Sequence, residues 1–202
     1  MTRLLVATTN ANKLREIRQL LDGARVDLVT LAQWPHILAP EETGQTFEEN
    51  ARAKAQYYAT ATGELTVAED SGLEIDALGG APGVQSARYG GDAATYPQKF
   101  ALIYDALRAR GVTTSPARFV CALALVNGNR VLFETRGIVE GTIAPEPRGT
   151  GGFGYDPIFF YPPYGQTLAE AGDAKAAVSH RGAAFRLLQQ FLASARGLGA
   201  GS

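Results

Sequence analysis

The chain has 202 residues, of which 19 are basic and 20 acidic, so its net charge is −1. This balance provides no global field that would favour a nucleic-acid polymer or an anionic membrane, so any phosphate binding must depend on locally placed cations and backbone amides. The single cysteine, Cys121, lies in an apolar run, excludes an intrachain disulfide and is expected to be buried rather than nucleophilic. The amino-terminal apolar stretch is too short for a secretory signal, and no later segment approaches the length of a membrane span. We therefore expect a cytoplasmic protein.

Predicted strands and helices alternate along the chain. Asn10 is a helix N-cap residue, Thr46-x-x-Glu49 is a capping box, and Asn127-Gly128-Asn129 predicts a hairpin turn. In chain order we predict a strand at 4–7, a helix that ends at Gly23, a strand at 26–31, a helix at about 46–62, strands at 65–68 and 73–78, a helix at about 96–110, strands at 119–126 and 131–143, a strand at 157–161 and a final helix from about residue 179.

This order mixes crossover helices with hairpins, which predicts an α/β protein with a mixed β-sheet flanked by helices. We expect residues 1–202 to form a single domain with two lobes, one from the helix-crossover half and one from the hairpin half. The active-site cleft is expected between the lobes.

The first polar segment that could bind a ligand lies at a junction between a predicted strand and a predicted helix. Thr8, Thr9, Asn10, Ala11, Asn12 and Lys13 combine hydroxyl groups, amides at the positive end of a helix and one cation. These groups suit a polyphosphate. The segment lacks the glycines and the Lys-Ser/Thr pair of a P-loop. The alternative is an ordinary capped helix with a surface lysine.

Adjacent carboxylates follow the predicted strand at 65–68. Glu69 and Asp70 repel each other in a partly desolvated site, and a hard divalent cation is the natural compensation. The alternative is a turn in which Asp70 caps backbone amides. Glu41 and Glu42 lie in the polar loop before the second helix and are solvated carboxylates unless that loop folds towards Asp70.

Two later segments carry aromatic and basic groups. In Gly151–Pro157, glycines on both sides of Phe153 allow a flat ligand to approach the ring, and Asp156 could orient polar groups there. Lys175 is followed by His180 and Arg181 in the first turn of the last helix, where basic residues oppose the helix dipole. This unfavourable placement argues against a purely structural role. The alternatives are a tight turn with its aromatic residues in the core for the first segment, and a surface position for His180 and Arg181, which is the commoner role of such a pair.

Together these segments resemble the inosine triphosphate pyrophosphatase family, and the resemblance covers nearly the whole chain in the family order. It implies the two-lobed α/β fold of that family, a homodimer, Mg²⁺ as cofactor and a purine nucleoside triphosphate as substrate. The implied reaction is hydrolysis of noncanonical purine triphosphates (ITP, dITP and XTP) to the monophosphate and pyrophosphate, which removes deaminated purines from the nucleotide pool. The matching segments are Thr8–Lys13, Phe47–Ala51, Ala68–Gly72, Leu78–Gly83, Ser86–Tyr89, Gly151–Pro157 and Ser179–Gly182.

The resemblance also implies roles for individual residues. Asp70 would be the general base and a metal ligand, and Ser71 would contact substrate. Glu41 matches the family's second metal-binding carboxylate, with the adjacent Glu42 as the alternative. Glu69 stands where many relatives have aspartate. The other implied substrate-binding residues are Thr8, Thr9, Asn10, Ala11, Asn12 and Lys13 for the triphosphate, and Phe153, Gly154, Tyr155, Asp156, Lys175, His180 and Arg181 for the base and sugar.

These roles predict attack of water on the α-phosphorus. Asp70 would take the proton of the water, and Lys13 would neutralise charge on the leaving pyrophosphate. Arg181 would donate to O6 and N7 of a 6-keto purine, whereas the 6-amino group of adenine would face it donor to donor. The alternatives are a pyrophosphatase for another modified base, a module that binds triphosphate without hydrolysis, and a kinase.

Overall fold

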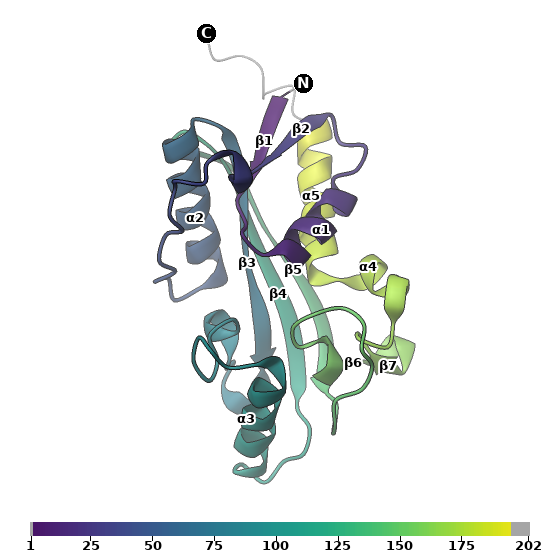
Figure 1. Cartoon of the computed structure of the whole chain (residues 1–202). Coiled ribbons are helices and arrows are strands. Elements are labelled where there is room, and N and C mark those ends of the chain that lie inside the picture. Colours follow the sequence, from purple (N-terminus) through teal and green to yellow (C-terminus); the bar gives the residue numbers. More distant parts are fainter. Residues whose placement is uncertain (1, 195–202) are drawn as a thin grey trace. The chain divides into compact units, whose positions relative to one another are not determined.

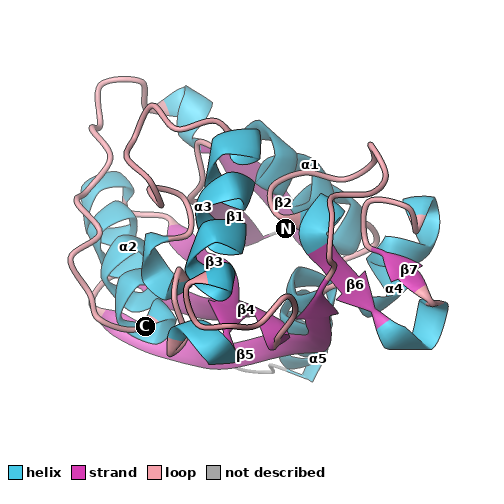
Figure 2. Ribbon diagram, turned by 90° about the horizontal axis from the view of Figure 1, so that it is seen from below, coloured by secondary structure: helices cyan, strands magenta, loops and turns pink. Residues whose placement is uncertain are grey.

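The computed structural model describes residues 2–194 (Figure 1). Strands connected by helices precede a run of consecutive strands, as predicted, and Figure 2 shows the strands in magenta and the helices in cyan. The strands are β1 (Thr2–Val6), β2 (Val26–Thr30), β3 (Leu65–Ile75), β4 (Pro116–Asn127), β5 (Arg130–Ile143), β6 (Phe159–Tyr161) and β7 (Gln166–Thr167). The helices are α1 (Ala11–Leu20), α2 (Phe47–Thr62), α3 (Tyr96–Arg108), α4 (Lys175–Val178) and α5 (His180–Ser194).

The seven strands form one mixed sheet in the order β2-β1-β3-β4-β5-β6-β7. Strand β1 is parallel to both β2 and β3, whereas β6 is antiparallel to β5 and β7. The predicted hairpin joins β4 to β5, and Gly128 in its turn has a positive φ of 56°. The α/β class with a mixed sheet is therefore confirmed.

The chain divides into two compact units, and β3, β4 and β5 contribute residues to both. The described part of unit 1 comprises residues 2–70, 121–137 and 181–194, and unit 2 comprises residues 71–120 and 138–180. Among residues 2–194, no helix has the length and apolar character that crossing a membrane requires.

The core of unit 1 lies between its strands and helices α1 and α5. Alternate residues of β1, β3 and β4 point to this core, because successive side chains of a strand face opposite sides of the sheet. Ile17 of α1 and its C-cap residue Leu21, together with Phe185 and Leu188 of α5, recur at helical spacing and cover that face. The strand residues that complete the core are Leu4, Val6, Leu65, Val67, Cys121, Leu123 and Leu125.

Unit 2 has a separate core. Helix α3 contributes Phe100, Ile103 and Leu107 at helical spacing, and Tyr155 and Phe159 pack into the same cluster. The other buried members are Leu73, Ile75, Leu78, Ala117, Phe119, Val139, Ile143, Ile158 and Leu168.

The prediction that a polar segment separates two strands near residue 70 was wrong. The polar run 69–72 was expected to end one strand before another began at residue 73, but β3 continues without a break from Leu65 to Ile75. Glu69 and Asp70 therefore lie inside a strand. In contrast, the capping box of Thr46 and Glu49 is confirmed, with both of its hydrogen bonds present. The last predicted strand is shorter than expected, since residues 156–158 form a 3-10 turn before β6.

Candidate active site

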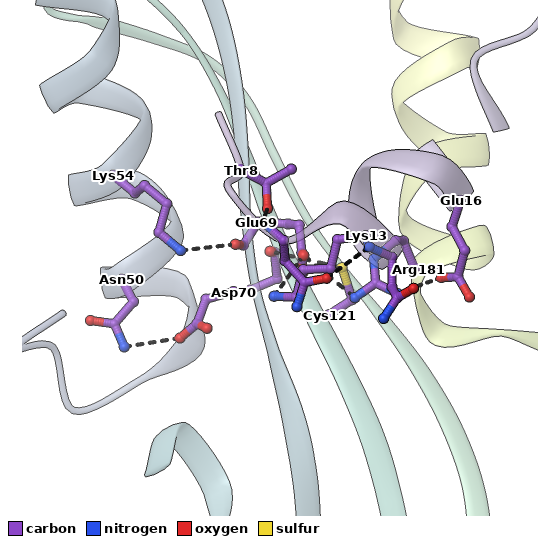
Figure 3. A network of polar contacts seen from close by, with 12 residues as sticks. Thr8, Lys13, Glu16, Asn50, Lys54, Glu69, Asp70, Cys121 and Arg181 are labelled. Carbon is purple, nitrogen blue, oxygen red and sulfur yellow. Dashed lines mark hydrogen bonds and ion pairs between the residues drawn. The ribbon is translucent and has the colours of Figure 1, made fainter. Parts of the chain in front are cut away.

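Glu69 and Asp70 occupy opposite faces of β3 within unit 1. Glu69 lies on the same face as Leu65 and Val67 and therefore points towards α1 and α5. Asp70 points towards α2 on the other face (Figure 3). Only 3% of Glu69 and 6% of Asp70 is exposed. Two neighbouring carboxylates are thus buried in different surroundings.

Glu69 is surrounded by cations. Its Oε1 lies 2.8 Å from Nζ of Lys13 and 3.4 Å from Nη2 of Arg181. Burial alone would raise the pKa of the Glu69 carboxyl, but the charges of Arg181 and Lys13 outweigh burial and hold this pKa well below its usual range. The thiol of Cys121 also donates to Oε2 at 3.4 Å. Glu69 is therefore a stable anion that is compensated by the protein itself.

Arg181 joins this cluster to α1. Its Nη1 donates to Oε2 of Glu16 at 2.5 Å, and only 1% of the residue is exposed. Arg181 and Lys13 come from the first turns of α5 and α1, so Glu69 holds the starts of two helices together (Figure 3). Sequence reasoning did not identify Glu16 or Glu69 as partners of Arg181.

Asp70 has a different environment. Its Oδ2 accepts a hydrogen bond of 2.9 Å from Nδ2 of Asn50, a neutral side chain on α2. Burial raises the pKa of the Asp70 carboxyl above its ordinary value, although the hydrogen bond from Asn50 and the charge of Lys54 act against this shift. A raised pKa brings a carboxylate closer to the range in which it works as a general base.

Lys54 lies one helical turn after Asn50 on the same face of α2. Its ammonium group forms an ion pair with Glu42 and donates to the backbone oxygen of Glu69 at 3.3 Å. Glu41 is exposed, whereas Glu42 is half-buried, and its charge is one of those that raise the pKa of Asp70. Of these two loop glutamates, Glu42 is the one with a described contact to the groups around Asp70.

The donors on this face of β3 fit a hard divalent cation. Asp70 and the nearby loop residue Glu42 carry carboxylate oxygens, the ligand type that Mg²⁺ prefers, and the charge of Glu42 acts on the Asp70 carboxyl. Among residues 2–194, no group of three or more His, Cys, Asp and Glu side chains is arranged to hold a metal. A cation here would thus need further oxygen ligands, and Mg²⁺ commonly takes these from water and phosphate.

The segment 8–13 forms the N-cap of α1. Oδ1 of Asn10 accepts hydrogen bonds from the backbone N–H groups of Asn12 at 3.0 Å and Lys13 at 3.1 Å. Thr9 and Ala11 are exposed, and Thr8 accepts from the amide of Asn10 at 3.2 Å. The cap fixes the start of α1 and with it the position of the Lys13 side chain.

Unit 2 contains the aromatic, acidic and basic residues that were predicted to bind the base and sugar. Oδ2 of Asp156 accepts from the amide of Phe153 and from Nζ of Lys175, both at 2.7 Å. The Lys175 ammonium also lies over the Phe153 ring, 4.7 Å from its centroid. A side chain at Gly152 would overlap the Asp156 carboxylate, and its positive φ of 68° also favours glycine. The glycines thus allow a compact cluster of one aromatic ring, one cation and one anion.

The remaining predicted residues of unit 2 have mixed environments. Tyr155 is 4% exposed and donates from its hydroxyl to the Ser86 backbone oxygen at 2.7 Å, so it is part of the packed interior. The His180 ring stacks on Phe119 with centroids 4.9 Å apart. Ser71 is partly exposed, and Gly154 has a positive φ of 72°.

Comparisons with known proteins identify the family. A sequence model of the Ham1 family matches residues 4–191. The chain belongs to the Ham1 family. A dITP/XTP pyrophosphatase from Geobacter sulfurreducens is 47% identical over 95% of this chain and 97% of the relative. Another dITP/XTP pyrophosphatase, from Mycobacterium tuberculosis, is 50% identical over 96% of this chain and 97% of the relative. The solved structure of a HAM1 protein from Coxiella burnetii has a TM-score of 0.91 and 40% identity, over 96% of this chain and all of that one.

Membership of the Ham1 family confirms the resemblance that the motifs indicated. Nucleotide pyrophosphatases of this family generally depend on a metal, and the oxygen donors around Asp70 are compatible with one. Sequence reasoning missed two members of the site, Asn50 and Lys54. Their spacing of four residues on the predicted helix was visible in the sequence, but their partners Asp70 and Glu42 are distant in the chain and were not.

Proposed function

We propose that this Ham1-family protein hydrolyses ITP, dITP and XTP to the nucleoside monophosphate and pyrophosphate, with Mg²⁺ as cofactor. The relatives named dITP/XTP pyrophosphatase support the substrate class. The observation that carries the proposal is the buried Asp70 carboxylate, whose pKa is raised and which lies on the same strand as the compensated Glu69. Removal of deaminated purines from the nucleotide pool is the corresponding cellular role.

Asp70 acts as the general base. Its raised pKa suits it to accept a proton from the water that attacks the α-phosphorus, whereas the depressed pKa of Glu69 makes that residue a poor base. Attack at the α-phosphorus releases pyrophosphate rather than orthophosphate. Glu69 therefore has a structural and electrostatic role, and Asp70 has the chemical one.

A divalent cation would be held by Asp70 together with a glutamate of the loop at 41–42. When bound, Mg²⁺ would neutralise phosphate charge and so stabilise the transition state and the leaving group. Glu42 is the proposed partner, because its charge acts on the Asp70 carboxyl and raises the pKa of that group.

The triphosphate is assigned to the start of α1. The Lys13 ammonium is held by Glu69, and its side chain is 17% exposed, so the cation is fixed in direction without being fully covered. A positioned cation stabilises negative charge as it develops on the leaving pyrophosphate. The exposed residues Thr9, Asn10 and Ala11 precede it on the same segment.

The base and sugar are assigned to the Phe153 cluster of unit 2. Phe153 provides an aromatic face, Lys175 provides a donor, and Asp156 fixes both of them. Gly154, Tyr155 and His180 complete this group, with Tyr155 supporting it from the packed interior.

We also infer a homodimer from the family resemblance, which light scattering on the purified protein would test.

The test is a steady-state comparison of ITP, XTP, GTP and ATP with Mg²⁺, with both products identified. The proposal predicts monophosphate and pyrophosphate in equal amounts, and faster turnover of ITP and XTP than of ATP and GTP. Release of orthophosphate, or equal turnover of all four nucleotides, would contradict it.

A further inference from the structure

Asn50 is a buried polar residue in the first turn of α2, and 3% of it is exposed. Both ends of its amide are used. Nδ2 donates to Oδ2 of Asp70 at 2.9 Å, and Oδ1 accepts from the backbone N–H of Gly44 at 2.8 Å. Asn50 thus links the strand that carries Asp70 to the loop that carries Glu42 (the Asp70 side of this link appears in Figure 3).

The loop fits closely against Asn50. A Cβ atom at Gly44 would lie 2.6 Å from Oδ1 of Asn50 and 2.9 Å from Cβ of Glu49, so only glycine permits this approach. The capping box of α2 fixes the same corner, since Glu49 accepts from the amides of Gln45 and Thr46. The chain leading from Glu42 into α2 is therefore held at a defined distance from β3.

The chemistry of the amide suits this position better than any other side chain of similar shape. An aspartate would accept from Gly44 but would place a second carboxylate against Asp70. A leucine would leave both Gly44 and Asp70 without these hydrogen bonds, at the cost of burying unpaired polar groups. Asparagine alone offers an acceptor on one side and a neutral donor on the other.

We propose that Asn50 is a positioning residue that couples the Glu42 loop to the Asp70 carboxylate. Its donor fixes the plane of the carboxylate, and its acceptor holds the loop so that Glu42 and Asp70 keep one relative position. This inference rests on the proposed role of Asp70 in hydrolysis. Asn50 itself does not contact the reacting atoms.

Loss of the link should affect both metal binding and turnover. Residues that orient metal-binding carboxylates typically change metal affinity or activity by about 10- to 100-fold when they are replaced. We expect Asn50→Ala to lower kcat with XTP by about 10- to 100-fold, with a change in KM of less than about threefold. The affinity for Mn²⁺ without nucleotide, measured by electron paramagnetic resonance, should fall over a similar range.

Two further variants separate positioning from stability. Asn50→Asp keeps the shape and the hydrogen bond from Gly44 but loses the donor to Asp70, so its kcat should fall as in Asn50→Ala. Thr62→Ala is the matched control, because it removes the hydrogen bonds of its hydroxyl to the Tyr58 backbone oxygen and from the Glu64 amide at the other end of α2, away from Asp70 and the Glu42 loop. Its kcat should stay within about twofold of the parent protein below the melting temperature.

The outcomes are distinct. If the Asn50 variants that fold keep the parental kcat and Mn²⁺ affinity, Asn50 is only structural and the proposal is wrong. If Asn50→Ala does not fold, Asn50→Asp decides by the same two measurements. An active Asp70→Asn variant would refute the proposed function at Asp70, whereas an inactive Asp70→Asn beside fully active Asn50 variants would refute only the positioning role.

Discussion

The two faces of β3 in unit 1 carry adjacent carboxylates with opposite properties. On the α1 and α5 face, Glu69 meets Lys13 and Arg181, and its pKa is depressed. On the α2 face, Asp70 meets the neutral amide of Asn50, and its pKa is raised. One carboxylate is paired with cations of the protein, and the other is hydrogen-bonded to a neutral amide and has a pKa that burial raises.

This difference explains how two neighbouring acids can serve different purposes. Alternation along the strand separates their side chains, so each responds to the helices that cover its own face. A carboxylate with fixed cations contributes to stability and positions those cations, whereas a buried one with a raised pKa is better suited to proton transfer. The predictions that follow test this division, beginning with the largest expected effect.

Replacement of Glu69 tests the stabilising face. Glu69→Gln removes the negative charge between Lys13 and the buried Arg181, so the free energy of unfolding should fall by about 3–5 kcal/mol. The measurement is urea denaturation followed by circular dichroism. The matched control is Glu64→Gln, which breaks the more exposed pair with Arg3 and should cost at most about 1 kcal/mol. Equal losses of unfolding free energy in Glu69→Gln and Glu64→Gln would contradict a special stabilising role for Glu69.

The two loop glutamates test the other face. Glu42→Gln should weaken Mg²⁺ or Mn²⁺ binding by about 10- to 100-fold, because a carboxylate ligand near Asp70 is lost. Glu41→Gln is the matched control and should change the affinity by less than about twofold, since Glu41 is exposed. Calorimetric titration of the apo protein provides both values. A larger loss of affinity in Glu41→Gln than in Glu42→Gln would instead assign the metal ligand to Glu41.

Arg181 tests whether the stabilising face also takes part in selectivity. Arg181→Lys keeps a charge for Glu69 but loses the planar pair of donors proposed to recognise a 6-keto purine. Loss of one such hydrogen bond is worth about 1–3 kcal/mol, so the preference for ITP over ATP in kcat/KM should fall by about fivefold or more. An unchanged preference with lowered stability would show that Arg181 acts only on Glu69 and Glu16.

Cys121 should have the smallest effect. Its thiol is fully buried beside Glu69, and burial and the Glu69 charge raise its pKa well above the usual value. Cys121→Ala should cost about 1 kcal/mol of stability and leave kcat unchanged. Thermal unfolding and a turnover assay would check this, and a large loss of turnover would mean that the thiol has a chemical role.

Local signals were sufficient to predict several elements and the family. The capping box of Thr46 and Glu49, the N-cap at Asn10 and the hairpin at 127–129 depend on short-range hydrogen bonds, and each forms as expected or leads into the predicted element. The run of motifs from residue 8 to residue 182 was enough to identify the family. These features need no knowledge of which segments meet in space.

The continuity of β3 could not be predicted because it depends on distant partners. Glu69 and Asp70 suggest a turn when read locally, but Lys13, Arg181 and Asn50 reach them from three separate helices and allow the strand to continue. The hydrogen bonds of Asn50 and the ion pair of Glu42 with Lys54 could not be predicted for the same reason, because they depend on the path of the loop. The pairing of charges across the fold decides these features.

The central claim is that Asp70 alone of the two acids performs the chemistry. Its most direct test is pyrophosphate release from XTP by Asp70→Asn at saturating Mg²⁺, with the melting temperature measured on the same sample. We predict a loss of about 10²- to 10⁴-fold in kcat with a melting temperature no lower than that of the parent protein. Turnover close to that of the parent in a folded Asp70→Asn variant would contradict the account.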